Sequence, residues 1–371
     1  MGGTLLVAAG GGGDVIAVAM VQRILSERGA PQPSHYASYS WDRLEIDPLP
    51  GPRDPTAFIA LKPVGRWNFQ VTASTVTRPP AQSHLPQLAA DLATPIFLLD
   101  PRHGAFGLRR QLRELVQLLE VDRVAVVDVG GDILARGYEP MLRSPLADFL
   151  VLAASVDLGI TTRILVLGLA LDGELDHAYA LQRCRTLSAS TSSFRLTAAH
   201  VHSFGPVFER HPSEVTGLLW LSVMGYSGRA EIRDEGLIVD LGPHGADVYE
   251  FDPQTVLAHN LLGQGLVSTT SLEEVEVCFH DAGLVSELDY EREKAAKLGE
   301  RDELEDPGAA DALAALREYE ADAARRGVDF LILRRVRTVL GLSPTGLERL
   351  RALLRAEQYP QYLPPVWLVR A

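Results

Sequence analysis

Residues 126–137 read Val-Val-Asp-Val-Gly-Gly-Asp-Ile-Leu-Ala-Arg-Gly. An apolar run at 124–127, typical of a buried strand, leads into a loop that carries two carboxylates, Asp128 and Asp132, with paired glycines between them. Ligands of open α/β sheets bind just beyond the carboxyl ends of the strands. The stretch therefore predicts a sheet strand whose end carries a small-molecule site.

The N-terminal stretch has the same layout. An apolar run at 5–9 precedes a glycine-rich loop, and Asp14 and a helical pattern over 15–25 follow it. The loop consists of four consecutive glycines, Gly10, Gly11, Gly12 and Gly13. We expect the two loops to lie side by side over one crevice.

Strand-like and helix-like segments alternate over roughly the first 285 residues, which is typical of an α/β fold. Apolar runs at 95–99 and 164–169 predict further buried strands, and leucines at helical spacing over 108–119 predict an amphipathic crossover helix. A hairpin over 229–241 is expected to form an antiparallel edge. We predict a Rossmann-like layered fold with a mostly parallel sheet.

Helix signals and composition divide the rest of the chain. Ser144-Pro145 matches the N-cap and first position of a helix. Residues 291–326 are dense in Ala, Glu, Arg, Lys and Asp, which predicts solvated helices with a mobile stretch over 297–306. A strand at 328–333 and an amphipathic helix at 347–354 are expected to follow.

We therefore predict two parts. Residues 1–288 form the α/β domain that carries the site. Residues 289–371 form a charged, mainly helical extension that packs on this core.

Composition restricts the class of partner. Of 371 residues, 46% are hydrophobic and 22% are charged, which is typical of a soluble globular protein, and the formal net charge is −13. Such a charge argues against nucleic acid as a partner. The two cysteines lack zinc-type spacing, and no run of about 18 apolar residues predicts a membrane span. We expect a cytoplasmic protein, and the sequence leaves open whether it forms a homo-oligomer.

The glycine loop has two interpretations. Backbone N–H groups ahead of a helix could bind phosphate or carboxylate, although neither the dinucleotide fingerprint nor a Walker-type motif fits. Alternatively, the glycines serve a tight turn that needs positive φ angles. Asp14 is either the N-cap of the helix or a catalytic carboxylate that points into the crevice.

The acids around the paired glycines Gly130 and Gly131 also leave alternatives open. Asp128, Asp132 and Glu139 suit Mg²⁺ or Mn²⁺ as ligands. They equally suit polar groups of a substrate, or acid–base catalysis at a raised pKa. The structural alternative is a helix cap with a surface salt bridge.

Other candidates lie on predicted loops. Asp172 follows the strand at 164–169, and an irregular region contains Trp41, Arg43 and Arg53, of which the arginines suit bidentate contact with an anion. His200, His202 and His211 allow a zinc site, but their spacing fixes no third ligand.

These residues resemble an uncharacterised family, domain of unknown function 1152, up to about residue 290. The segments that carry the resemblance are Gly10–Val15, Trp41–Arg43, Asp47–Pro48, Pro50–Arg53, Asp128–Gly137, Glu139–Asp148, Asp172–Leu175 and Ser271–Glu274. The loop at 130–137 is also similar to the Gly-Gly-Asn-Glu-Ile-Gly-Met-Gly loop of the metal-dependent D-glutamate cyclase family, with Asp132 in place of Asn and Ile133 in place of Glu. The second resemblance implies lyase or cyclase chemistry.

The leading hypothesis is an enzyme that acts on a small anionic metabolite, a nucleotide or an amino-acid derivative. The glycine loop would bind its anionic group, and Asp132, with Asp128 or Asp14, would act as acid/base or hold a divalent ion. Elimination, cyclisation and hydrolysis all fit, because none of them needs a covalent nucleophile. The alternatives are a ligand sensor or scaffold without turnover and, third, a nicotinamide-dependent oxidoreductase.

Overall fold

A large mixed sheet forms the centre of the protein. The structure is a computed structural model and describes residues 2–143, 145–187, 194–299 and 306–369. The sheet has nine strands in the order β10-β13-β9-β8-β1-β2-β7-β5-β4. Its parallel centre consists of β9 (Thr161–Leu167), β8 (Val121–Val129), β1 (Gly3–Ala8), β2 (Ser34–Tyr39) and β7 (Ile96–Leu99). Antiparallel strands flank it on both sides: β10 (Phe194–Arg195), β13 (Asp247–Phe251), β5 (Asn68–Val71) and β4 (Lys62–Val64).

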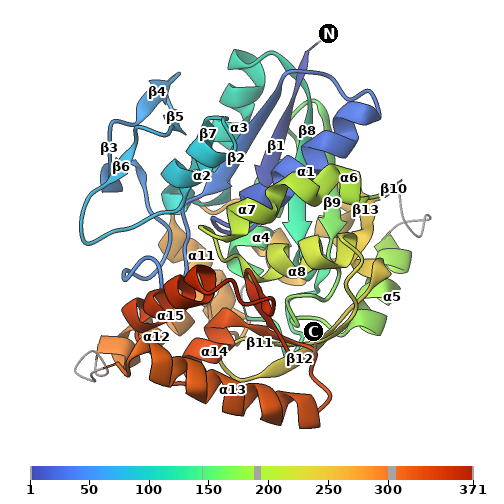
Figure 1. Cartoon of the computed structure of the whole chain (residues 1–371). Coiled ribbons are helices and arrows are strands. Elements are labelled where there is room, and N and C mark those ends of the chain that lie inside the picture. Colours follow the sequence, from blue (N-terminus) through green and yellow to red (C-terminus); the bar gives the residue numbers. More distant parts are fainter. Residues whose placement is uncertain (1, 144, 188–193, 300–305, 370–371) are drawn as a thin grey trace.

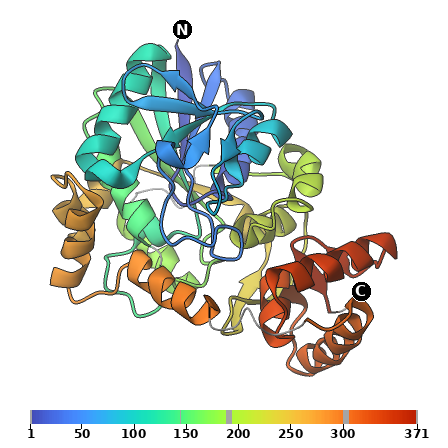
Figure 2. The ribbon, with the colours of Figure 1, turned by 90° about the vertical axis from the view of Figure 1, so that its left-hand side faces the viewer.

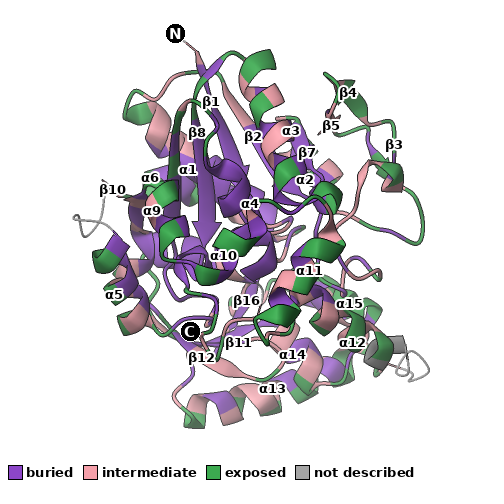
Figure 3. Cartoon of the chain, turned by 180° about the vertical axis from the view of Figure 1, so that it is seen from behind, coloured by how far each residue is buried: buried purple, intermediate pink, exposed green. Residues whose placement is uncertain are grey.

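Helices cover both faces of this sheet (Figure 1). Alternate residues of a strand point to opposite faces, and on β1 Leu5 and Val7 join one apolar cluster whereas Leu6 and Ala8 join another. The first cluster includes α3 (Gly104–Leu118), α4 (Pro145–Ser155), α5 (His177–Leu187), α9 (Pro253–Ala258), α10 (Leu261–Leu266) and α11 (Leu272–Asp281). The second includes α1 (Asp14–Glu27), α2 (Leu85–Asp91), α6 (Ala198–Val201), α7 (Gly205–Phe208) and α8 (Glu214–Val223). The central strands are consequently buried on both faces (Figure 3).

The strands predicted at 5–9, 95–99, 124–127 and 164–169 are confirmed as β1, β7, β8 and β9. The predicted crossover helix is α3. Helix α4 begins at Pro145, and the expected N-cap, Ser144, lies outside the described residues. Long apolar runs therefore identified the core elements correctly.

The predicted hairpin forms, but in a second sheet. Strands β11 (Gly228–Ile232) and β12 (Leu237–Leu241) pair antiparallel, and β11 also pairs in parallel with β14 (Phe330–Ile332). The order of this sheet is β12-β11-β14-β16-β15, with β16 at Val366–Leu368 and β15 at Tyr362–Leu363. The hairpin therefore does not border the main sheet, because the C-terminal strands extend the sheet that the hairpin begins.

Three C-terminal helices, α13 (Ala309–Arg325), α14 (Leu333–Val339) and α15 (Pro344–Ala356), pack around this second sheet, and a separate apolar cluster lies beneath them. Figure 2 shows these three helices together at one end of the molecule. Helix α12 (Glu287–Gly299) packs on the main body instead, because its Leu288 belongs to the first apolar cluster of the main sheet. Most of the stretch expected to be mobile, 297–306, lies outside the described residues.

The remaining elements are short. Strands β3 (Phe58–Ile59) and β6 (Val76–Thr77) form a two-stranded sheet, and 3₁₀ turns occur at Pro55–Ala57, Pro101–His103, Asp132–Leu134, His202–Phe204 and Pro243–Ala246. Across the described ranges, no helix has the length and apolar character needed to cross a membrane.

The chain leaves the neighbouring strands β1 and β8 toward opposite sides of the sheet. From β1 the chain continues through α1 to β2 and then to β7 on one side, whereas β8 is followed by β9 on the other side. Connections that leave neighbouring parallel strands in opposite directions open a crevice between them. The two loops predicted to meet are the loops that follow β1 and β8.

Packing of α3 on the sheet gives a test of this architecture. Leu112 is fully buried, whereas Leu118 of the same helix is 49% exposed. We expect Leu112→Ala to lower the free energy of unfolding by about 2–5 kcal/mol, because it leaves a cavity in the core. Leu118→Ala, the matched control, should change it by about 0.5 kcal/mol or less. Urea denaturation of the two variants measures both values, and equal effects would contradict the placement of α3.

Candidate functional site

A cavity of about 260 Å³ lies at the carboxyl ends of the parallel strands. The loops that follow four neighbouring strands, β9, β8, β1 and β2, contribute to its lining. Helix α12 and Arg334 of α14 add side chains from the C-terminal part. The crevice expected from the sequence is therefore bounded by elements from both ends of the chain.

Most of the predicted site residues line this cavity. They are Gly10, Gly11, Gly12, Gly13, Asp14, Trp41, Arg43, Asp128, Asp132 and Asp172. Arg53, Gly130, Gly131 and Glu139 are not among the lining residues.

These four residues support the loops instead. Glu139 accepts hydrogen bonds from the backbone N–H groups of Arg136 (2.7 Å) and Gly137 (2.9 Å) and from the hydroxyl of Tyr179 (2.6 Å). The guanidinium of Arg53 pairs with Asp47 (2.9 Å) and donates to the nearby carbonyl oxygen of Leu49 (3.0 Å). These contacts account for the positions of Glu139 and Arg53 without a ligand.

The paired glycines make room for an acid of the site. Gly130 and Gly131 have φ angles of +127° and +100°, which L side chains rarely adopt. A Cβ at Gly130 would also collide with Oδ2 of Asp172. The glycines therefore let Asp172 approach the loop that carries Asp128 and Asp132.

The four consecutive glycines are needed for packing, not for unusual φ angles. None of them is among the described glycines with positive φ, so the positive-φ interpretation is wrong. A Cβ at Gly11 would collide with the carbonyl oxygen of Trp41, and one at Gly13 would lie 2.5 Å from Oγ of Ser213. Gly13, not Asp14, holds the N-cap position of α1, and Asp14 lines the cavity.

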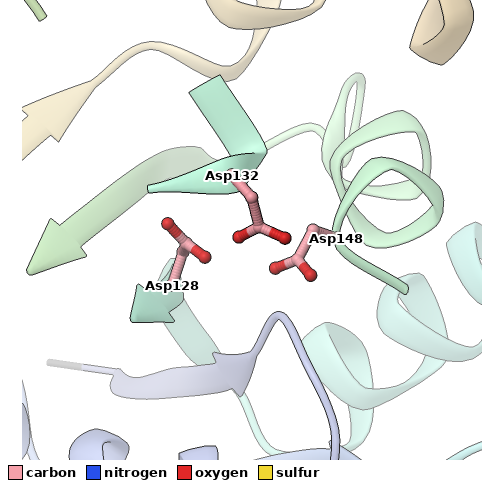
Figure 4. A group of neighbouring side chains, drawn as sticks. All are labelled: Asp128, Asp132 and Asp148. Carbon is pink, nitrogen blue, oxygen red and sulfur yellow. The ribbon is translucent and has the colours of Figure 1, made fainter. Parts of the chain in front are cut away.

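Three aspartates converge at the end of β8 (Figure 4). One carboxylate oxygen from each of Asp128, Asp132 and Asp148 lies within 4.8 Å of the others, and all three residues are buried. Asp128 is only 2% exposed, and its Oδ2 has no hydrogen-bond partner among the described residues. An unpaired buried carboxylate oxygen is costly, so this cluster is suited to a bound cation.

Burial shifts the titration of these acids. It raises the pKa of Asp128 to about 6, although hydrogen bonds with Asp132 and Asp148 oppose the shift. Burial also holds the pKa values of Asp132 and Asp148 well above the usual range, and repulsion from nearby carboxylates, Asp128 among them, adds to both shifts. Burial, aided by Glu174, raises the pKa of Asp172 to about 8. Burial, aided by Asp128, raises that of Asp14 to about 7.

A protein-family match covers most of the residues that form this cavity. A family model described as "Protein of unknown function (DUF1152)" matches residues 5–295. The chain belongs to the DUF1152 family. The matched region contains every residue that lines the cavity except Arg334. Neither the search of curated proteins nor the search of solved structures finds a match.

Acids outnumber bases around the cavity of this DUF1152 protein. The acidic lining residues are Asp14, Asp42, Asp128, Asp132, Asp148, Asp172, Glu174, Glu214, Glu235, Glu287 and Glu291, and the Lys and Arg residues are Arg43, Arg143, Arg233, Lys294 and Arg334. Arg43 and Arg334 both pair with Glu214, at 2.6 and 3.3 Å, and Arg233 pairs with Glu174 at 3.0 Å. The basic groups are therefore engaged with acids other than the three converging aspartates.

Asp148 and Glu287 line the cavity but were not among the predicted site residues. Asp148 lies on α4, where every residue is buried, and an acid inside such an apolar helix was a usable signal. Glu287 is the first residue of α12, and its Oε2 is buried without a hydrogen-bond partner among the described residues. No local pattern could place it against α4. The zinc interpretation finds no support, since His200 bonds Glu27 (2.9 Å).

The raised pKa values predict how stability depends on pH. The folded protein holds these protons more tightly than the unfolded chain, in which aspartate has a pKa of about 3.9. This contribution is therefore complete below about pH 4 and is lost as pH rises through the folded pKa values of about 6 for Asp128 and about 8 for Asp172.

Asp132→Asn removes one of the repelling carboxylates. In the presence of EDTA, we expect its free energy of unfolding, relative to wild type, to increase from pH 5 to pH 8. Urea denaturation at both pH values measures the difference. A difference that stays constant or falls with pH would contradict the buried cluster.

Proposed function

We propose that this protein is an enzyme that holds a divalent cation, Mg²⁺ or Mn²⁺, and acts on a small anionic metabolite. Asp128, Asp132 and Asp148 would be the ligands of the cation. The observation that carries the proposal is the unpartnered Oδ2 of Asp128, which is buried among carboxylate oxygens that lie within 4.8 Å of one another. Oxygen ligands of this kind suit hard cations.

Charge supports a cation over a neutral ligand. Bringing several carboxylates out of water costs free energy unless they are paired, protonated or bound to a metal. Three of the arginines that line the cavity are engaged with Glu214, Glu174 and Glu235. A divalent ion would remove the repulsion and allow all three aspartates to ionise at neutral pH.

The glycine loop and two arginines support an anionic substrate. The loop at 10–13 precedes α1, whose N-terminus carries a partial positive charge that favours anions. The side chain of Arg43 is 43% exposed and that of Arg143 is 37% exposed, and both line the cavity. An anion bound in the cavity could exchange with the carboxylates that these arginines contact. We infer that the fold is Rossmann-like and that the substrate is a nucleotide or an amino-acid derivative.

Elimination, cyclisation and hydrolysis are the reactions that we propose. A bound divalent ion would supply Lewis acidity to the reacting group. Asp14, with its pKa raised to about 7, is suited to give or accept a proton near neutral pH. The loop at 130–137, similar to that of a metal-dependent cyclase family, is compatible with a lyase or cyclase.

One observation favours the alternative, a ligand sensor without turnover. Glu291 of α12 accepts hydrogen bonds from Nε1 of Trp41 (3.0 Å) and from the N–H of Gly51 (2.6 Å), and Lys294 pairs with Glu45 (2.8 Å). The C-terminal part thus contacts the loop beside the cavity. Binding of metal and metabolite without any product would favour the sensor.

Thermal unfolding tests the cation. At about 100 times its dissociation constant, Mn²⁺ should add about 2.7 kcal/mol to the free energy of unfolding. Asp132→Asn and Asp148→Asn should lose this gain, and Asp281→Asn, which removes an exposed carboxylate, should keep it. If Mn²⁺ and Mg²⁺ stabilise wild type and Asp132→Asn equally, the cation site is wrong.

A second test measures binding of the anionic substrate separately from binding of the cation. Nucleotides, sugar phosphates and amino acids are added to the Mn²⁺-loaded protein, and binding is followed by calorimetry. We expect Arg43→Gln to weaken binding of the active compound about tenfold or more, because a charge-assisted contact is lost, and to leave Mn²⁺ binding unchanged. Unchanged affinity in Arg43→Gln would contradict the role assigned to Arg43.

A further inference from the structure

A histidine lies in the same cavity, beside the glycine loop. His84 precedes α2, and its backbone N–H donates to Oδ2 of Asp42 (3.1 Å). Its ring Nδ1 lies 3.4 Å from Oδ1 of the same carboxylate. Asp42 is buried, and a Cβ at Gly12 would lie 2.6 Å from its Oδ1. Asp42 therefore fixes both the backbone of His84 at the start of α2 and the side of its ring that carries Nδ1.

The other ring nitrogen of His84 is accessible. Nε2 makes no hydrogen bond within the described residues, and it is not one of the buried polar atoms that lack a partner. The side chain is 22% exposed and lines the cavity. Since Nδ1 faces Asp42, Nε2 is the ring nitrogen that a molecule in the cavity can reach.

A second histidine supports this ring from behind. His211 is perpendicular to His84, with ring centroids 5.1 Å apart, and its Nε2 lies 2.7 Å from Oδ2 of Asp91. Arg210 donates to both carboxylate oxygens of Asp91, at 2.8 and 3.0 Å. An ionised Asp91 only accepts hydrogen bonds, so Nε2 of His211 must carry the hydrogen. Its Nδ1 is buried and has no partner among the described residues.

The ring of His211 is neutral near pH 7. Burial, aided by the neighbouring His84, lowers its pKa to about 4. The groups that face His84 are therefore one carboxylate, Asp42, and one neutral imidazole.

We propose that His84 is a catalytic acid–base group of the cavity, in addition to Asp14, and that Asp42 and His211 are its positioning residues. The proposal rests on the function proposed above and assigns its proton transfer. The lone pair of Nε2 takes a proton from the substrate, and the electron pair of the broken bond stays on the substrate. The resulting imidazolium keeps its Nδ1–H toward Asp42, and in the reverse direction Nε2 returns the proton. A carboxylate beside the ring stabilises the imidazolium that forms.

The arrangement predicts opposite tautomers for the two histidines. Side-chain ¹⁵N NMR of the metal-free protein should show His84 with hydrogen on Nδ1 and His211 with hydrogen on Nε2. Asp42→Asn should weaken the preference of His84 and leave that of His211 unchanged. A wild-type His84 with its hydrogen on Nε2 would overturn the proposal, because that nitrogen could not accept a proton.

Chemical modification measures how available Nε2 is. Diethyl pyrocarbonate reacts with unprotonated imidazole nitrogens, and mass spectrometry reports each histidine separately. We expect His84 to react several-fold faster in wild type than in Asp42→Asn, while the exposed His202 reacts equally in both and His211 stays unmodified. Equal rates for His84 in the two proteins would show that Asp42 does not activate the ring and would refute its positioning role.

Neither readout depends on the cation. Asp132→Asn should lose Mn²⁺ binding and keep both the tautomers and the reactivity of His84. Loss of the Mn²⁺ effect alone would therefore refute the metal site, and loss of the His84 results alone would refute the acid–base assignment.

Discussion

Repulsion between buried carboxylates is the constraint on which the site depends. Asp128 and Asp132 are fixed by the end of β8, and Asp148 is fixed by α4, a helix in which every residue is buried. The backbone cannot move these acids apart without opening the apolar layer beneath them, because close-packed cores resist such shifts. The surrounding structure therefore holds together carboxyl groups that would repel each other once ionised, and burial raises their pKa values. Strain of this kind is typical of functional sites.

Much of this arrangement could be predicted from local sequence. Parallel strands buried on both faces appear as continuous apolar runs, so β1, β7, β8 and β9 were recognisable, and with them the edge at which Asp14, Asp128, Asp132 and Asp172 meet. Loop residues were harder to assign, because glycines and charged residues serve packing as well as ligands. Gly130 makes room for Asp172, and Glu139 bonds to backbone N–H groups, so neither faces the cavity.

The rest of the site depends on contacts between distant parts of the chain. Helix α12 reaches the cavity because Leu288 packs in the main core and Glu291 bonds to Trp41 and Gly51. Arg334 of α14 reaches it because β14, which α14 follows, pairs with β11. No periodicity within the C-terminal part specifies this pairing. The same pairing explains why the hairpin over 229–241 does not border the main sheet: its β11 edge receives β14. The positions of Arg334 and of the hairpin therefore depend on tertiary strand pairing and not on local propensity.

The two chemical parts of the cavity are complementary. A carboxylate that coordinates a divalent cation is a poor proton acceptor, because the cation's charge lowers its basicity. If Asp128, Asp132 and Asp148 hold a cation, proton transfer must fall to groups outside the cluster. Asp14 and His84 line the same cavity at the glycine loop, and the Asp42 carboxylate is 3.4 Å from the ring of His84. A histidine stays basic near neutral pH without adding negative charge to a cavity that already has an excess of it. This division of roles explains why an imidazole lies among so many carboxylates.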